Sequence, residues 1–279
     1  MNLLITGISG FLGRNMVNNI LNNKIECNII GTGHSEAKIA LFKSIFPNIK
    51  IYVVDLSSDD FKNDLENILK NHKITHIIHS AAMKHVDICQ ENPTKALKVN
   101  TIATNTIINV AKQYDVKNII ALSTDKTNNP CNTYGMVKYI MQEDILANNF
   151  SVYQGANFFW SDGSVLDIWF NQFIKNKPLT IRDKNHVRYF NTIDDVCSII
   201  FENINEHKKI ILPKSVYSVK LEDLLDAFCE YFNYHNVIHV PKYNYEKEVE
   251  ILRDEVTNII CLGKEEVKKI IDKFYKNML

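Results

Sequence analysis

Short apolar runs alternate with longer amphipathic segments from the first residues of the chain. Nearly continuous apolar runs are typical of strands in a parallel sheet that helices cover on both faces, and they occupy residues 3–5, 28–30, 51–54, 76–78 and 118–122. Between these runs, apolar residues recur at helical spacing over 11–21, 36–46, 60–69 and 93–114. This alternation predicts a Rossmann-type, doubly wound parallel sheet of the α/β class.

The pattern becomes less regular after about residue 150. Helical spacing recurs over 166–175, 194–203 and 222–234, and short strands are expected near Ile210 and Val237. We therefore expect a Rossmann domain over 1–155 that binds the cofactor and carries the catalytic residues. A smaller, interleaved substrate-binding lobe is expected over 156–279.

A glycine-rich loop follows the first predicted strand and precedes the first predicted helix. Its three glycines have the spacing GxxGxxG. The missing Cβ atoms permit a tight turn and the close approach of a pyrophosphate, and the start of the helix supplies free N–H groups. The loop therefore predicts a dinucleotide site rather than an ordinary turn, with contacts from Gly7, Ser9, Gly10, Phe11, Leu12 and Gly13.

The end of the second predicted strand bears on the choice between NADP and NAD. In NAD sites an acidic residue usually stands there and binds the ribose 2′-hydroxyl. Here the strand ends in Thr32, His34 and Ser35, without a carboxylate. A carboxylate would repel a 2′-phosphate, whereas these side chains can bind one, so the sequence favours NADP. The alternative is that Glu36 turns back and NAD is used.

Other candidate cofactor contacts follow the third, fourth and fifth predicted strands. Asp55 is placed to accept a hydrogen bond from the adenine amino group, and Ala81 and Ala82 offer small side chains beside the nucleotide. Their alternative interpretations are a helix cap and close packing. The set comprises Asp55, Leu56, Ala81, Ala82, Lys84, Asn100 and Ser123.

Tyr134 and Lys138 form a YxxxK pair shortly after the fifth predicted strand. Residues four apart lie on one face of a helix, if the segment is helical. A phenol is a poor base at neutral pH, but a nearby ammonium and a bound pyridinium favour the phenolate. Tyr134 is therefore a candidate for proton exchange with a substrate hydroxyl, and it would also contact the cofactor, as would Lys138.

The glycine loop and the YxxxK pair together resemble the extended short-chain dehydrogenase/reductase superfamily. Five segments narrow the resemblance to the bacterial UDP-N-acetylglucosamine 4,6-dehydratases of polysaccharide and flagellin-glycan biosynthesis. They are AAMKHVD at 81–87, ENPTKALKVN at 91–100, LSTDKTNNPCNTYGMVK at 122–138, GSV at 163–165 and RYFNTIDD at 188–195.

This resemblance implies a reaction on UDP-GlcNAc with NADP regenerated in each cycle. Tyr134, with Thr124 and Lys138, would remove the C4 hydroxyl proton as hydride leaves C4. Lys126 would remove the C5 proton that the ketone makes acidic, and Asp125, as a protonated acid, would assist loss of the C6 hydroxyl. Return of the proton from the opposite face would invert C5. The alternative for Asp125 and Lys126 is a solvated surface ion pair.

The substrate contacts implied by the resemblance are Lys84, Asn157, Ser161 and Arg188, with Arg188 suited to a UDP phosphate. His85 is interpreted as a histidine that packs or supports the site residues rather than as a base, because the tyrosine, lysine and aspartate already supply the proton transfers.

The chain departs from this subfamily at three places. The sequence reads YQGAN over 153–157, where an arginine and a tyrosine are expected before the asparagine, and Asp162 stands where an arginine is expected. The glycine loop reads SGFLG, which is closer to general sugar-nucleotide epimerases and reductases. One alternative is therefore a downstream epimerase or reductase of the 4-keto-6-deoxy or 5,6-unsaturated UDP-sugar. A second is a non-catalytic, NADP-binding regulatory subunit.

Composition favours a small-molecule partner. Lys plus Arg equals Asp plus Glu at 32 each, so no strong field of either sign points to nucleic acid or to an anionic membrane. No run approaches 18 apolar residues, and the six cysteines are scattered without metal-ligand spacing. We expect a cytoplasmic protein without a metal site, and the resemblance implies a homo-oligomer.

Overall fold

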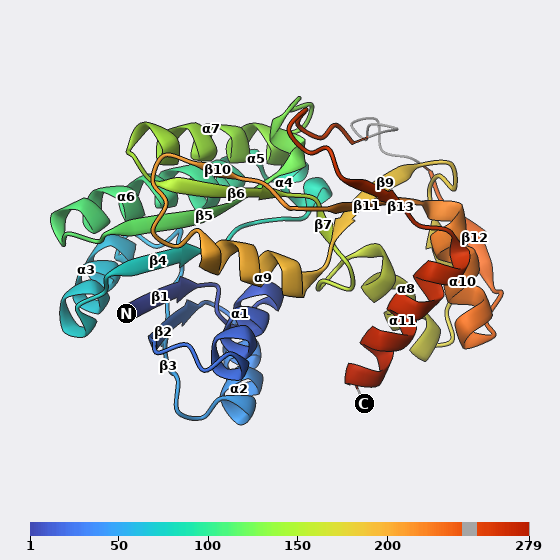
Figure 1. The fold of residues 1–279 in the computed structure, drawn as a ribbon, viewed down its shortest axis with the longest axis horizontal. Coiled ribbons are helices and arrows are strands. Elements are labelled where there is room, and N and C mark those ends of the chain that lie inside the picture. Colours follow the sequence, from blue (N-terminus) through green and yellow to red (C-terminus); the bar gives the residue numbers. More distant parts are fainter. Residues whose placement is uncertain (242–249, 279) are drawn as a thin grey trace. The chain divides into compact units, whose positions relative to one another are not determined.

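The structure, a computed structural model, describes residues 1–241 and 250–278 (Figure 1). The chain divides into two compact units, Met1–Gly155 with Ile193–Leu212, and Ala156–Thr192 with Pro213–Leu279. Ile193–Leu212 thus belongs to the first unit, whereas the expected division at 155 and 156 would place it in the C-terminal lobe. The physical reason is that α9 (Ile193–Glu202) packs against α1 (Phe11–Asn22), and β10 (Ile210–Ile211) pairs with β6 (Ser151–Gly155).

The first unit is built on a seven-stranded parallel sheet in the order β10-β6-β5-β4-β1-β2-β3 (Figure 1). Chain order reverses between β1 and β4, so the crevice of this Rossmann sheet opens at the carboxyl ends of these two neighbouring strands. All five predicted strands are present. The remaining strands of the sheet are β1 (Asn2–Thr6), β2 (Asn28–Gly33), β3 (Lys50–Val53), β4 (His76–His79) and β5 (Asn118–Thr124).

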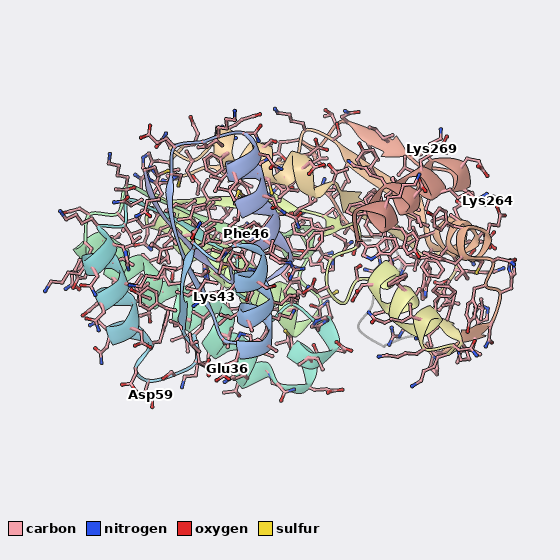
Figure 2. All side chains as sticks on the ribbon, turned by 90° about the horizontal axis from the view of Figure 1, so that it is seen from below. Glu36, Lys43, Phe46, Asp59, Lys264 and Lys269 are labelled. Atoms are coloured by element: carbon pink, nitrogen blue, oxygen red, sulfur yellow. The ribbon has the colours of Figure 1, made fainter. Side chains whose placement is uncertain are left out.

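Helices cover this sheet through apolar faces. On one face, α3 (Phe61–His72), α6 (Ala103–Gln113) and α7 (Thr133–Ala147) pack side by side over a core of aliphatic residues. The helix α2 (Glu36–Ile45) begins where the Ser35 hydroxyl accepts a hydrogen bond from the backbone N–H of Lys38. Figure 2 shows Glu36 and Phe46 at the two ends of α2.

The helix expected over 93–114 is interrupted. The chain forms α5 (Pro93–Leu97), a five-residue π-helix η1 (Lys98–Ile102), and then α6. Such single π turns are frequent at functional sites, and this one contains the candidate residue Asn100. The short helices α4 (Val86–Glu91) and η2 (Asp125–Thr127) complete the first unit.

The second unit has an aromatic core between two small sheets and three helices. One sheet has the strand order β13-β11-β9-β7, and β12 pairs with β8 in the other. Phe159 stacks on Phe190 at 4.4 Å between ring centroids, and Trp169 packs edge-on to Phe228. The elements are β7 (Asn157–Phe158), α8 (Val165–Ile174), β8 (Leu179–Ile181), β9 (Val187–Asn191), β11 (Val216–Lys220), α10 (Leu221–Phe232), β12 (Val237–His239), β13 (Ile259–Cys261) and α11 (Lys264–Met278).

Within residues 1–241 and 250–278, no helix has the length and apolarity needed to cross a membrane.

Candidate active site

The glycine loop closes over the carboxyl ends of β1, β2 and β4. Gly7 has φ of 71°, and a Cβ on it would lie 3.0 Å from the backbone of Ala81, so this position needs glycine for both its conformation and its space. The helix α1 begins at Gly10 without a side-chain cap and without an acidic residue in its first turn. Its first N–H groups are therefore suited to a pyrophosphate, and the residues present fit a bound dinucleotide.

The residues at the end of β2 that favoured NADP, Thr32, His34 and Ser35, include no carboxylate. Thr32 is buried, and the Ser35 hydroxyl is used to cap α2. Arg14 was not among the residues predicted from the sequence, and its Nη1 donates a hydrogen bond of 2.9 Å to the Ser9 carbonyl. Ser9 in turn lies against Gly33, since a Cβ on Gly33 would be 3.0 Å from the Ser9 Oγ. A basic residue directly after the third glycine was the available signal.

Asp55 is held for hydrogen bonding at the end of β3. Its Oδ1 accepts hydrogen bonds from the backbone N–H of Ser57 at 2.8 Å and from the Ser57 hydroxyl at 2.6 Å. These bonds, the hydroxyl first, lower the pKa of Asp55, and the charges of Lys95 and His34 act in the same direction. Asp55 therefore remains an acceptor at neutral pH, and the half-buried Leu56 packs against the core beside it.

Asn100 positions the loop that follows β4. Its Oδ1 accepts from the Met83 N–H and its Nδ2 donates to the Met83 carbonyl, both at 2.8 Å. Ala81 is tied to the other side of the crevice, because its N–H donates to Thr6 Oγ1. Ala82 is half-buried beside it, whereas Lys84 is exposed.

His79, which the sequence analysis did not single out, links the same loop to the helices. Nδ1 lies 2.7 Å from Thr6 Oγ1, and Nε2 lies 3.0 Å from Thr104 Oγ1. Because the Thr104 hydroxyl donates to the Asn100 carbonyl, Nε2 carries the ring proton and Nδ1 accepts. Burial lowers the pKa of His79 to about 3. The ring is therefore a neutral, buried connector, whereas His85 is exposed before α4.

Four candidate catalytic side chains meet where β5 ends and α7 begins. The Thr124 hydroxyl donates to Asp125 Oδ1 at 2.8 Å, and Lys126 Nζ donates to the same oxygen at 3.2 Å. The Thr124 side chain acts to lower the pKa of Tyr134. The helix α7 brings Tyr134 here because Asn132 caps its start by accepting from the Gly135 N–H at 2.9 Å.

Lys138 lies one turn further along α7 and is buried. Its Nζ donates to the Leu122 carbonyl and lies 3.5 Å from Met141 Sδ. Burial lowers the pKa of Lys138 to about 8. Ser123 is turned toward α7, where its hydroxyl donates to Gln142 Oε1 at 2.8 Å.

Without a bound cofactor, the Tyr134 phenol stays protonated at neutral pH and cannot act as a base. Burial raises the pKa of Tyr134 to about 12, and the positive charge of Lys126 only partly opposes this shift. The expectation that a neighbouring ammonium would favour the phenolate is thus outweighed by desolvation. A further positive charge at the site, such as an oxidised nicotinamide ring carries, is needed to favour the phenolate.

A sequence model of the family described as polysaccharide biosynthesis protein matches residues 3–267. The chain belongs to this family. A relative, UDP-N-acetylglucosamine 4,6-dehydratase (inverting) of Campylobacter jejuni subsp. jejuni serotype O:2, is 31% identical over 241 residues, which cover 81% of this chain and 70% of that protein.

Solved structures of nucleotide-sugar dehydratases and epimerases share the fold of this family member. DesIV, a dTDP-glucose 4,6-dehydratase from Streptomyces venezuelae with NAD and TYD bound, has a TM-score of 0.85 at 16% identity, over 99% of this chain and 98% of that chain. UDP-glucose 4-epimerase from Thermotoga maritima has a TM-score of 0.84 at 18% identity, with both chains fully covered.

The residues of β6 that depart from the family resemblance support the loop that follows β5. Gln154 Nε2 donates to the Thr124 carbonyl at 3.3 Å and to Asn128 Oδ1 at 2.9 Å. Tyr153 is fully buried, and a Cβ on Gly155 would lie 2.5 Å from its ring. Gln154 therefore holds the loop that carries Thr124 and Asn128, and the Tyr153 ring fills the space beside Gly155.

In the second unit, two predicted substrate contacts meet on a buried carboxylate that the sequence analysis missed. Arg188 Nη1 lies 2.6 Å from Glu250 Oε1, and Asn157 Nδ2 donates to Glu250 Oε2 at 2.9 Å. Ser161 lies in a turn in which its carbonyl accepts from the Ser164 N–H. Spacing gave no signal for Glu250, which is 62 residues from Arg188.

The side chains of 1–241 and 250–278 include no group of three or more His, Cys, Asp or Glu placed to hold a metal ion.

Proposed function

We propose that this protein is a nucleotide-sugar dehydratase that converts UDP-GlcNAc into the 4-keto-6-deoxy sugar, with retained NADP and inversion at C5. The observation that carries the proposal is the cluster of Thr124, Asp125, Lys126 and Tyr134 beside Lys138. It combines a redox pair with an acid and an amine, and elimination at the neighbouring carbons needs both additions. The C. jejuni relative bears the name of this activity.

Bound NADP would accept the hydride from C4 and return it to C6. The residues that would hold it are the loop glycines Gly7, Gly10 and Gly13, with Asp55 at the adenine. Thr32, His34 and Ser35 would face the 2′-phosphate, and Arg14 would add positive charge at the same end of the site.

The chain's own residues would manage three protons. Tyr134 would take the proton of the C4 hydroxyl, and Lys126 would take the proton from C5 once C4 is a ketone. Asp125, once protonated, would donate its proton to the C6 hydroxyl as that group leaves as water. Lys138 would hold the cofactor ribose and, by its charge, favour the phenolate of Tyr134. Asn157, Ser161, Arg188 and Lys84 would contact the UDP-sugar.

A second candidate is a downstream UDP-sugar epimerase or reductase. One observation favours it: a UDP-glucose 4-epimerase of Rickettsia bellii is 27% identical over 71% of this chain. A non-catalytic regulatory subunit has no chemical need for the ordered cluster around Thr124.

Incubation with UDP-GlcNAc in D₂O, followed by mass spectrometry and NMR, tests the proposal. We expect loss of one water, deuterium at C5 and no net consumption of NADP. Turnover only with a pre-formed 4-keto-6-deoxy sugar would establish the second candidate. Binding of NADP without turnover of either sugar would leave the regulatory interpretation.

A further inference from the structure

A lysine from α5 reaches the loop that follows β3. Lys95 Nζ donates a hydrogen bond to the hydroxyl of Ser57. The Ser57 hydroxyl donates in turn to Asp55 Oδ1 at 2.6 Å. A lysine ammonium only donates, an ionised carboxylate only accepts, and a serine hydroxyl has a single proton. The two bonds therefore run one way, from Lys95 through Ser57 to Asp55, the candidate partner of the adenine amino group.

Both hydrogen bonds to the Asp55 carboxylate use the same oxygen. Oδ1 accepts from the Ser57 hydroxyl and, at 2.8 Å, from the Ser57 backbone N–H. Within residues 1–241 and 250–278, Asp55 Oδ2 accepts no hydrogen bond, and the residue is exposed. Adenine presents an amino group as a hydrogen-bond donor at its edge. A carboxylate that is fixed through one oxygen can offer the other to this group in a set direction.

The lysine decides which way the Ser57 hydroxyl points. Ser57 is 7% exposed, so the hydroxyl has little water to bond with. Because Lys95 donates to its oxygen, the hydroxyl proton is directed to Asp55 Oδ1. The charge of Lys95 also helps to keep Asp55 ionised, because it lowers the pKa of that carboxyl, although less than the two bonds from Ser57 do. Loss of Lys95 would therefore loosen the carboxylate without removing any group that can touch adenine.

Lys98 makes a comparable contact that holds only the loop. It begins η1, one turn after Lys95, and its Nζ lies 3.3 Å from Asp59 Oδ1. The Asp59 side chain is 100% exposed, and an ion pair at the surface contributes little. Lys98 therefore ties the same segment to the same loop through Asp59 rather than through Ser57, and it supplies a matched control.

We propose that Lys95 is a positioning residue for the adenine of the cofactor. It holds the Ser57 hydroxyl as a donor to Asp55 Oδ1, and this leaves Asp55 Oδ2 as the fixed acceptor for the adenine amino group. The inference rests on the cofactor site of the proposed function. It assigns the recognition of the base to a lysine on α5 that lies 40 residues after the carboxylate in the sequence.

The experiment compares NADP with nicotinamide hypoxanthine dinucleotide phosphate, in which an oxygen replaces the adenine amino group. Fluorescence titration of the full chain, freed of bound nucleotide, gives both Kd values. Wild type should prefer NADP by at least about tenfold, because hydrogen bonds to charged groups are the stronger kind. Lys95→Met should reduce this preference by at least about threefold, through weaker binding of NADP. Lys98→Met should keep the wild-type preference. Equal weakening of both dinucleotides in Lys95→Met would overturn the proposal, since it would show that Lys95 meets a phosphate or only holds the loop.

A double-mutant cycle tests the route through the serine. Ser57→Ala should reduce the preference for NADP as Lys95→Met does. Lys95→Met should add little in the Ser57→Ala background, because residues that act through one hydrogen-bond chain are not additive. Fully additive losses would show that Lys95 acts on the base by another route, and they would refute the positioning role.

A further measurement needs neither cofactor nor substrate. The ¹³Cγ resonance of Asp55 in labelled protein, assigned with Asp55→Asn, reports the pKa of this carboxyl. Lys95→Met should raise that pKa, and Lys98→Met should not; equal effects of the two variants would contradict the proposal.

The outcomes also separate this inference from the proposed function. If the preference for NADP depends on Lys95 but no UDP-sugar is dehydrated, the proposed function fails and the positioning role stands. If UDP-GlcNAc is dehydrated and the preference does not depend on Lys95, the function stands and this inference fails.

Discussion

Replacement of Gly13 by alanine should destabilise the first unit and weaken cofactor binding. A Cβ on Gly13 would lie 2.4 Å from the Ile8 carbonyl oxygen and 2.5 Å from the Ile8 Cα. Ile8 cannot move away toward β2, because its side chain already packs directly against Gly31. A Cβ on Gly31 would lie only 2.4 Å from Ile8 Cγ2. Alanine in a helix gains about 1 kcal/mol over glycine, but overpacking of this kind costs about 1–3 kcal/mol or more. Since the contact is with backbone on a blocked side, we expect the upper end of that cost and a net loss of about 2 kcal/mol.

Thermal unfolding and cofactor titration measure both effects. A loss of about 2 kcal/mol lowers the Tm by about 4–8 °C for a unit of this size. We also expect the Kd for NADP to rise by at least about tenfold, because Ile8 belongs to the glycine loop that is proposed to contact the pyrophosphate and each 1.4 kcal/mol is a factor of ten. Gly263→Ala is the matched control, since its Cβ would approach only the flexible Glu266 side chain, at 3.2 Å. A Gly13→Ala protein with unchanged Tm and affinity would refute the steric argument.

Three further predictions concern charged side chains. Arg14→Leu should weaken NADP binding by at least about tenfold and leave NAD binding nearly unchanged, as fluorescence titration would show; an equal loss for both would exclude a role at the 2′-phosphate. Glu250→Gln should lower the stability of the second unit by about 3–5 kcal/mol, because it leaves Arg188 facing a neutral group at a buried pair; an unchanged Tm would contradict this. The lowered pKa of Lys138, about 8 against 10.5, means that the unfolded chain binds more protons between these values, so stability rises with pH there. Lys138→Met should therefore stabilise the protein at pH 7 by up to about 3 kcal/mol, which a higher Tm would show. This gain in stability should shrink toward pH 10. A gain that is the same at both pH values would show that the buried charge of Lys138 does not cause it.

The sequence predicted the elements that depend on local pattern. A buried parallel strand appears in the sequence as an apolar run, so it can be predicted without knowledge of the fold. Gly7 could be assigned to a tight turn because it stands between a predicted strand and a predicted helix. Asn100 was predicted as a cofactor contact, whereas both ends of its amide bond to the backbone of Met83. The partnership of Glu250 with Arg188 was not predictable, because it depends on the path of the chain between them and leaves no periodic trace. Residues 193–212 belong to the first unit although they follow residue 155 in the chain, and the sequence could not show this because helical spacing predicts a helix but does not say which sheet it covers.

The departures on β6 are physically linked to one another. Tyr153 and Gly155 point to the same side of the strand, and the Tyr153 ring occupies the space where a Cβ on Gly155 would stand, at 2.5 Å. A tyrosine at 155, as the family resemblance would suggest, cannot coexist with Tyr153 in this position. Gln154, on the opposite side, is buried and bonds to the Thr124 carbonyl, where a charged arginine would have to be desolvated. The substitutions therefore form one support beneath Thr124 rather than independent losses, which explains how the cluster of candidate catalytic residues stays ordered without the expected arginine and tyrosine.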